Sequence, residues 1–290
     1  MNGFVNIIKP QGMTSALCVM LCRKKLTKQF GKTKLGHMGT LDPMASGVLP
    51  MGINQSSRLF DYLLDKTKVY VATFKFGYET DTLDETGTVI DSGYRTPTEE
   101  EIENVLPGFI GEIDQIPPKY SAKCVMGKRG YELARRGVDF TLEPKKVTII
   151  DLKLIEKTSD DEFVFYIKCK GGTYVRSIGR DIAYALETKA TMTALDRVEA
   201  GIFKESSAVT LDDFMETDDV TEFIIPSDDV LSFDKLVLEK DVAQRILDGY
   251  FIDEILYPDG MYRVYSENTF WGVGIVTENK LKIVTYVRDI

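Results

Sequence analysis

The segment from Gly36 to Pro50 constrains the fold most, because its composition excludes a regular helix. Three glycines and two prolines lie within these fifteen residues, and both residue types interrupt helical backbone. We therefore predict one long structured loop over residues 31–52, and loops of that length in compact domains are usually functional. Its only carboxylate, Asp42, precedes Pro43, which favours an extended backbone there. Because Asp-Pro pairs also initiate ordinary turns, the residue types leave a catalytic and a structural role open.

Hydrophobic patterns outside this segment predict both strands and helices. Residues 69–76 alternate apolar with polar side chains, as a half-buried strand does. Residues 15–30 carry a helical pattern that Thr14 or Ser15 can cap. Further strands are expected at 4–8, 147–154 and 163–169, a strand pair at 191–204, and further helices at 98–106, 131–137 and 177–187.

After about residue 225 the sequence pattern changes to short strand patterns separated by turn residues. Four short strand patterns follow, at 236–238, 261–265, 272–277 and 281–287, with turn residues between them. A chain of 290 residues suits one large domain with one small domain. We therefore predict a large domain at 1–225 and a small β domain at 226–290.

Charge is distributed unevenly in this chain of net charge −9. Residues 211–290 hold 18 acidic and seven basic side chains, so residues 1–210 carry a net charge of +2. Residues 1–36 hold seven basic and no acidic side chains, 119–147 hold eight against three, and 168–180 hold four and none. Charge runs are usually solvated faces. Three basic clusters in an acidic protein nevertheless predict polyanion binding, which depends on local potential.

The sequence has few residues or segments that would bind a metal or a cofactor or span a membrane. His37 is the only histidine, and the four cysteines show no C-x-x-C spacing. Gly31-Lys32-Thr33 lacks the glycine that a phosphate loop needs at the position of Leu26. The apolar run 16–22 is too short to cross a bilayer, and the N-terminus lacks a signal-peptide layout. We expect a cytoplasmic monomer with no metal, cofactor or membrane segment.

A second motif, residues 170–178, follows a predicted strand and offers Tyr174 and Arg176. Side chains two apart on extended backbone face the same side. The Arg176 guanidinium could hold a carboxylate by two hydrogen bonds. A structural ion pair is the commoner role of a single arginine, so both roles stay open.

Three further features point to RNA, each with a plainer alternative. Residues 119–135 are basic with interleaved tyrosines, which is typical of phosphate contact and base stacking. Tyr70 begins a predicted strand, where a core role is more frequent than a catalytic one. His37 adjoins the glycine-rich loop and could be a ligand, a base or a stacking ring.

These strings resemble the motifs of one known family in order and spacing. The chain resembles the TruB family of tRNA pseudouridine synthases from end to end. Residues 3–15 resemble the first motif, 36–50 the catalytic-aspartate motif, 115–135 the RNA-clasping insertion and 172–177 the arginine motif. After Pro50 the sequence Asn54-Gln-Ser-Ser-Arg58 departs from the family's usual Gly-Glu-Ala-Thr-Lys.

The resemblance implies a fold and its domains. The fold is α+β, with a long mixed, largely antiparallel sheet and flanking helices. A catalytic domain at 1–225 contains the RNA-clasping insertion at about 115–147. The acidic module at 226–290 is similar to the family's small PUA-type β domain.

The resemblance also implies the reaction and its substrate. Family members isomerise uridine 55 to pseudouridine in the TΨC loop of tRNA, after flipping the base out of its stack. The implied partner is the T-arm of tRNA. No cofactor is implied, because the reaction neither gains nor loses atoms.

Roles of individual residues follow from the matching motifs. Asp42 is the essential carboxylate, which attacks ribose C1′, adds to the base or removes a 2′ proton. Arg176 holds Asp42 ionised, and Tyr70 contacts the flipped base and helps remove its C5 proton. The implied substrate or RNA contacts are His37, Tyr174, Leu195, Asp84, Arg58 and Lys9.

Other functions stay open at this stage. The same fold could serve as a non-catalytic tRNA-binding or tRNA-folding module. A paralogue could act on a different RNA uridine, as the altered 54–58 string allows. A glycosyl-transfer enzyme for small molecules could also use Asp42, although three basic segments argue against it.

Overall fold

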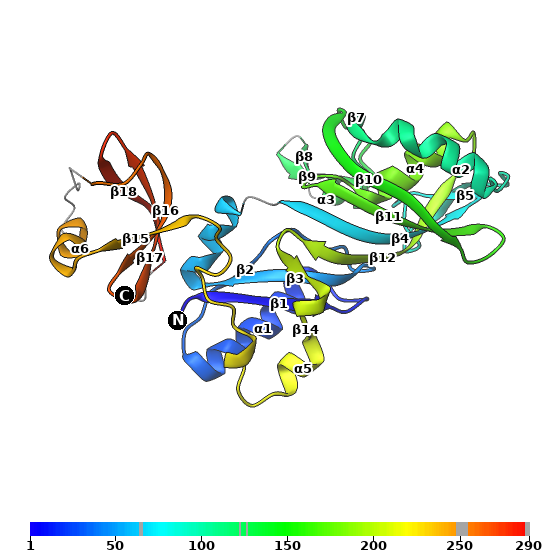
Figure 1. The fold of residues 1–290 in the computed structure, drawn as a ribbon. Coiled ribbons are helices and arrows are strands. Elements are labelled where there is room, and N and C mark those ends of the chain that lie inside the picture. Colours follow the sequence, from blue (N-terminus) through cyan, green and yellow to red (C-terminus); the bar gives the residue numbers. More distant parts are fainter. Residues whose placement is uncertain (64–65, 122, 126, 248–254, 288–290) are drawn as a thin grey trace. The chain divides into compact units, whose positions relative to one another are not determined.

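The structure is a computed structural model that describes residues 1–63, 66–121, 123–125, 127–247 and 255–287 (Figure 1). The chain forms two compact units. The first unit comprises Met1–Asp42, Val48–Asp65 and Gly201–Ile290, and the second comprises Pro43–Gly47 and Lys66–Ala200. The division at residue 225 therefore stays a prediction, and residues 122, 126, 248–254 and 288–290 of the predicted insertion and β domain lie outside the described residues.

The first unit begins with a strand and a helix where the sequence predicts them. Strand β1 (Gly3–Lys9) pairs in parallel with β14 (Val209–Thr210). Helix α1 (Ser15–Phe30) starts where the Thr14 hydroxyl accepts the backbone N–H of Leu17, and Gly31 ends it at φ 78°. The helix buries Cys18, Cys22 and Leu26.

The prediction of one loop over 31–52 is wrong. Strands β2 (Leu35–His37) and β3 (Ser46–Ile53) lie within or overlap this segment and pair antiparallel. Nearly every residue of β3 is buried, so the strand lacks the alternation that identifies a half-buried strand. Irregular backbone remains at residues 31–34 and at residues 38–45, which include Asp42.

The C-terminal part of the first unit contains the four predicted strands. Strands β15 (Asp234–Leu238), β16 (Gly260–Ser266), β17 (Thr269–Thr277) and β18 (Lys280–Tyr286) form one sheet in that order. Its core contains Leu236, Val264, Val276 and Leu281. Further elements are η1 (Asn54–Tyr62), β13 (Phe203–Lys204), η3 (Glu205–Ser207), α5 (Leu211–Glu216), η4 (Thr221–Phe223) and α6 (Lys240–Leu247).

The second unit is built on strands in the order β12-β4-β11-β10-β7, all paired antiparallel. The first residues of β3 extend it, because Ser46 and Gly47 pair in parallel with β12. The strands span β12 (Ala190–Ala200), β4 (Thr67–Phe76), β11 (Glu162–Lys170), β10 (Lys145–Lys157) and β7 (Gly111–Gln115). The expected mixed, largely antiparallel α+β architecture is confirmed.

Helix α4 (Val175–Ala185) packs directly on this sheet. A Cβ on Gly179 would lie 2.2 Å from the ring of Phe74 on β4, so only glycine permits the close approach. Phe74 in turn packs edge-on against Phe165 of β11, with centroids 5.4 Å apart. This contact sets the position of α4, whose first turn carries Arg176.

Smaller elements complete the second unit. Helix α2 (Glu99–Val105) begins with a capping box between Thr98 and Glu101. The remaining elements are β5 (Tyr78–Thr80), β6 (Val89–Ser92), η2 (Leu106–Phe109), β8 (Cys124–Val125), β9 (Lys128–Arg129) and α3 (Gly130–Arg135). No helix among the described residues is long and apolar enough to span a membrane.

Candidate active site

The backbone before Asp42 is held by one side chain of helix α1. The buried Ser15 hydroxyl donates to the carbonyl of Leu41 at 2.8 Å and accepts its N–H at 2.9 Å. A hydroxyl can do both because it has one donor and two lone pairs. Asp42 itself is half-buried. The reciprocal pair of bonds therefore fixes the chain directly before the predicted carboxylate.

His37 lies at the end of β2, where the same irregular segment begins. Its Nε2 lies 3.2 Å from the hydroxyl of Thr40, and the next residue, Met38, donates its N–H to the Pro50 carbonyl at 2.9 Å. The ring is half-buried. The His37 side chain and the Asp42 loop are thus both anchored within the first unit.

Arg176 is a buried cation in the first turn of α4. Its Nη1 donates to the carbonyl of Thr82 at 2.8 Å and lies 3.3 Å from Oδ2 of Asp84, and its Nη2 donates to the carbonyl of Tyr120 at 3.1 Å. The side chains of Arg176 and Asp84 are only 7% and 6% exposed. These contacts to the backbone of Thr82 and Tyr120 and to Asp84 hold the buried guanidinium in a fixed position.

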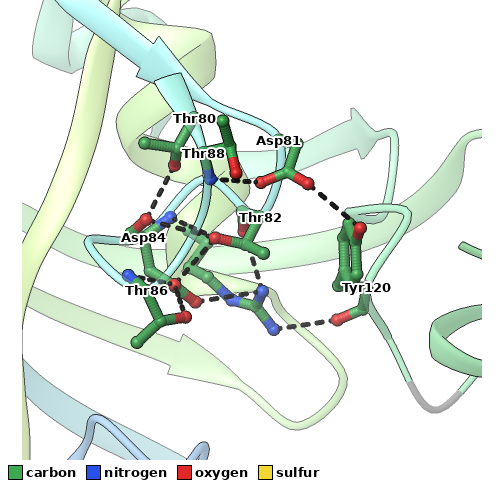
Figure 2. A network of polar contacts seen from close by, with 8 residues as sticks. Thr80, Asp81, Thr82, Asp84, Thr86, Thr88 and Tyr120 are labelled. Carbon is green, nitrogen blue, oxygen red and sulfur yellow. Dashed lines mark hydrogen bonds and ion pairs between the residues drawn. The ribbon is translucent and has the colours of Figure 1, made fainter. Parts of the chain in front are cut away.

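Asp84 is held by its own loop between β5 and β6 (Figure 2). Its Oδ1 accepts the hydroxyls of Thr82 at 2.8 Å and Thr86 at 2.5 Å, and the N–H of Thr86 at 3.1 Å. Oδ2 faces Arg176. The observed role of Asp84 is therefore to pair with Arg176, and its predicted RNA contact stays a prediction.

Tyr70 and Leu195 lie on adjacent strands of the second unit. Tyr70 on β4 is opposite Arg197 on β12, and Leu195 is opposite Ala72, so all four share one face of the sheet. Tyr70 and Leu195 are each 7% exposed. Arg197 is fully buried and hydrogen-bonds to Tyr70, and burial lowers the pKa of Arg197. Sequence reasoning missed Arg197, whose only signal is a basic residue inside a strand pattern.

Tyr174 precedes α4, and its backbone is held from both sides. The buried side chain of Gln115 donates to the Tyr174 carbonyl at 3.1 Å and accepts its N–H at 2.8 Å. Gln115 is the last residue of β7 and the first residue of the predicted insertion. Sequence reasoning assigned Gln115 no role, because an isolated glutamine carries no pattern.

The sequence matches family models along most of its length. Residues 24–175 match the N-terminal domain of TruB family pseudouridylate synthase. Residues 176–232 match the tRNA pseudouridylate synthase B C-terminal domain, and residues 235–282 match the C-terminal domain of pseudouridine synthase II TruB. The chain belongs to the TruB family. The predicted resemblance is therefore confirmed.

Individual relatives agree with this TruB assignment. The chain is 40% identical to "tRNA pseudouridine synthase B" of Clostridium novyi, over 98% of both chains. It is 38% identical to the protein of that name from Caldanaerobacter subterraneus, over 97% of both. A chain in a solved H/ACA RNP bound to a substrate RNA containing 2′-deoxyuridine shares the fold, with a TM-score of 0.68 and 22% identity. That match covers 99% of this chain and 84% of the other.

Two residues assigned to RNA from the TruB resemblance differ sharply in exposure. Arg58 is exposed on η1. Lys9 is fully buried, and its ammonium donates to the carbonyls of Pro10 and Met13, both at 2.7 Å. These bonds give Lys9 a structural role in the turn before α1, and its RNA contact stays a prediction.

The structure groups the predicted TruB site residues by unit. The first unit contains Asp42, His37, Arg58 and Lys9. The second unit contains Tyr70, Asp84, Tyr174, Arg176 and Leu195. Among the described residues, no group of three or more His, Cys, Asp or Glu side chains is arranged to hold a metal ion. The polar groups that converge are those around Arg176.

Proposed function

We propose that this member of the TruB family isomerises uridine to pseudouridine in tRNA, at position 55 of the TΨC loop. The observation that carries the proposal is the similarity to relatives named tRNA pseudouridine synthase B across almost the whole chain. The buried ion pair of Arg176 and Asp84 supports it, because a site that stabilises a reactive carboxylate needs a fixed cation.

The proposed reaction exchanges one glycosidic bond for another. The N1–C1′ bond of the flipped uridine breaks, the uracil turns, C5 bonds to C1′, and the C5 proton is lost while N1 gains one. Asp42 acts as nucleophile or base, and Arg176 holds that carboxylate ionised. Tyr70 contacts the base and assists removal of the C5 proton, while Tyr174 and Leu195 pack beside the base.

The proposed substrate is tRNA, recognised at its T-arm by a monomer in the cytoplasm. The three basic segments at 1–36, 119–147 and 168–180 supply phosphate contacts. His37 packs where the flipped base leaves a gap in the loop. Arg58, Lys9 and Asp84 complete the proposed RNA contacts.

Tritium release tests the proposal. A full-length unmodified tRNA transcript labelled at uracil C5 is incubated with the wild-type protein and with Asp42→Asn. We expect release by wild type only, and mapping of the modified site to uridine 55. Tight tRNA binding without release by wild type would favour a non-catalytic binding module, and release mapped elsewhere would indicate a different uridine target.

A further inference from the structure

The segment 115–120 begins at the last residue of β7 and leads into the basic part of the insertion. Three of its residues form hydrogen bonds to α4 or to Tyr174, which precedes that helix. Besides the two bonds between Gln115 and Tyr174, the carbonyl of Ile116 accepts Ser177 Oγ and Arg180 Nη2, both at 2.9 Å. The two residues after Ile116 are buried prolines, whose rings fix φ. We call residues 115–120 the strap.

Tyr120 ends the strap, and its carbonyl and hydroxyl have different partners, Arg176 and Asp81. Figure 2 shows the Tyr120 hydroxyl pointing towards Asp81. The Tyr120 carbonyl accepts Arg176 Nη2 at 3.1 Å, while its hydroxyl donates to Oδ2 of Asp81 at 3.0 Å. Arg176 Nη1 returns to the backbone of Thr82, the next residue after Asp81. The hydrogen bond to Asp81 raises the pKa of Tyr120, so the hydroxyl keeps its proton.

Asp81 is a rigid partner for Tyr120. Its Oδ1 accepts the N–H of Thr88 at 2.8 Å, and its own N–H donates to the Thr88 carbonyl at 3.0 Å. A Cβ on Gly87 would lie 2.5 Å from Asp81 Oδ1 and 2.3 Å from Thr82 Oγ1, so the loop is packed closely around the carboxylate. In this pair the Asp81 carboxylate is therefore held by its own loop, while Tyr120 belongs to the strap.

We propose that the Tyr120–Asp81 hydrogen bond positions Arg176 and couples the basic insertion to it. Tyr120 presents its carbonyl to the guanidinium only while its ring is held against Asp81. A displacement of the insertion, such as one on closing over RNA, is transmitted through Tyr120 to the orientation of Arg176. Tyr120 and Asp81 are positioning residues, and their effect on a reaction rate rests on the function proposed above.

Tyr120→Phe tests the inference, because it removes only the hydroxyl. We expect the single-turnover rate at saturating tRNA to fall about tenfold, the size expected for one lost hydrogen bond to a carboxylate. The dissociation constant for tRNA should stay at the wild-type value, and the melting temperature should fall by no more than about 2–4 °C. Tyr94→Phe is the matched control, because its exposed hydroxyl also donates to an aspartate, Asp91, at 2.9 Å. That control should keep the wild-type rate.

The Asp81→Asn variant tests whether an amide can replace the carboxylate as the partner of the Tyr120 hydroxyl. The amide can still accept from Thr88 and can donate to the Tyr120 hydroxyl, so we expect a rate within about threefold of wild type. Combining it with Tyr120→Phe should cost no more than Tyr120→Phe alone, because the two residues act through one bond. An additive loss would overturn the coupling.

A hydrogen-exchange measurement keeps the inference separate from the proposed reaction. We expect faster amide exchange over residues 119–121 and 127–131 in Tyr120→Phe, with no change there in Tyr94→Phe. Wild-type rate and exchange in Tyr120→Phe would overturn the inference, as would a loss that arises only from weaker tRNA binding. No tritium release by wild type would count against the proposed function alone, and the exchange result would then decide the inference.

Discussion

Two loops of this protein each present an aspartate, and they differ in how deeply its side chain is buried. The loop between β5 and β6 surrounds Asp84 with the hydroxyls of Thr82 and Thr86, and it leaves the side chain 6% exposed. The loop between β2 and β3 fixes the backbone at Leu41 through Ser15 and leaves Asp42 half-buried.

The difference distinguishes Asp84, whose carboxylate has a structural role, from Asp42, the candidate reactive carboxylate. One carboxylate oxygen of Asp84 accepts hydrogen bonds from its own loop, and the other is paired with Arg176. The negative charge of Asp84 is therefore already neutralised. A nucleophile or general base has to be positioned without being consumed by its surroundings. The Ser15 hydroxyl holds the backbone directly before Asp42 and so positions this carboxylate within its loop.

The comparison assigns the largest effect to Asp42→Asn. We expect turnover to fall by at least about 10³-fold, because the amide can neither attack nor accept a proton. The melting temperature and tRNA affinity should stay unchanged, as measured by calorimetry and filter binding. Retained turnover in the purified variant would contradict the assignment.

Asp84→Asn should damage stability as well as activity. It removes the buried carboxylate that lies 3.3 Å from Arg176 Nη1, and breaking a buried ion pair from one side costs about 3–5 kcal/mol. Urea denaturation measures this loss. Asp139→Asn is the control, because the Lys119–Asp139 pair is 58% and 94% exposed and should not affect the denaturation midpoint. Equal midpoints for both variants would show that the buried pair is not stabilising.

Ser15→Ala tests whether the two hydrogen bonds from Ser15 to the Leu41 backbone contribute to the function of Asp42. The buried N–H and carbonyl of Leu41 would lose their partner, at a cost of about 1–3 kcal/mol, and the isomerisation rate should fall with tRNA affinity unchanged. Ser57→Ala removes a comparable bond, to the Asn54 carbonyl, and should keep the wild-type rate. Equal rates for the two variants would argue against this role of Ser15.

The smallest effect concerns an exposed carboxylate away from both loops. The Arg95 guanidinium, followed by the Thr98 N–H, lowers the pKa of Glu101 to about 2. A lowered pKa in the folded state contributes stability above the ordinary value of 4.5, and this contribution is lost as pH falls towards about 2. Glu101→Gln should therefore lower the melting temperature slightly above about pH 5 and not at about pH 2. A pH-independent difference would contradict the assignment to charge.

Much of the fold could be predicted because local patterns agree with it. Helix α1 begins at its Thr14 cap, β4 shows alternation, and the four C-terminal strands are separated by turn residues. The prediction failed at β3, because a strand buried on both faces shows no alternation and Pro50 resembles a loop signal. Local periodicity cannot distinguish such a strand from an ordered loop.

The site was predictable in its residue types and less so in its contacts. Arg176 was identified as a cation able to hold a carboxylate, yet its bonds to Thr82, Asp84 and Tyr120 span more than fifty residues of chain. Gln115 and Arg197 gave no recognisable signal, because a buried polar residue is identified only by the partners that satisfy it.

The sequence by itself determined the family, most secondary structure, the basic segments and the identity of the candidate carboxylate and arginine. These follow from short-range patterns and from motif order, which a linear chain displays directly. Only the tertiary structure decided that Asp84 pairs with Arg176, that Lys9 is buried and that the strap reaches Tyr174. Such contacts join distant segments, and burial selects them because an unsatisfied buried polar group is costly.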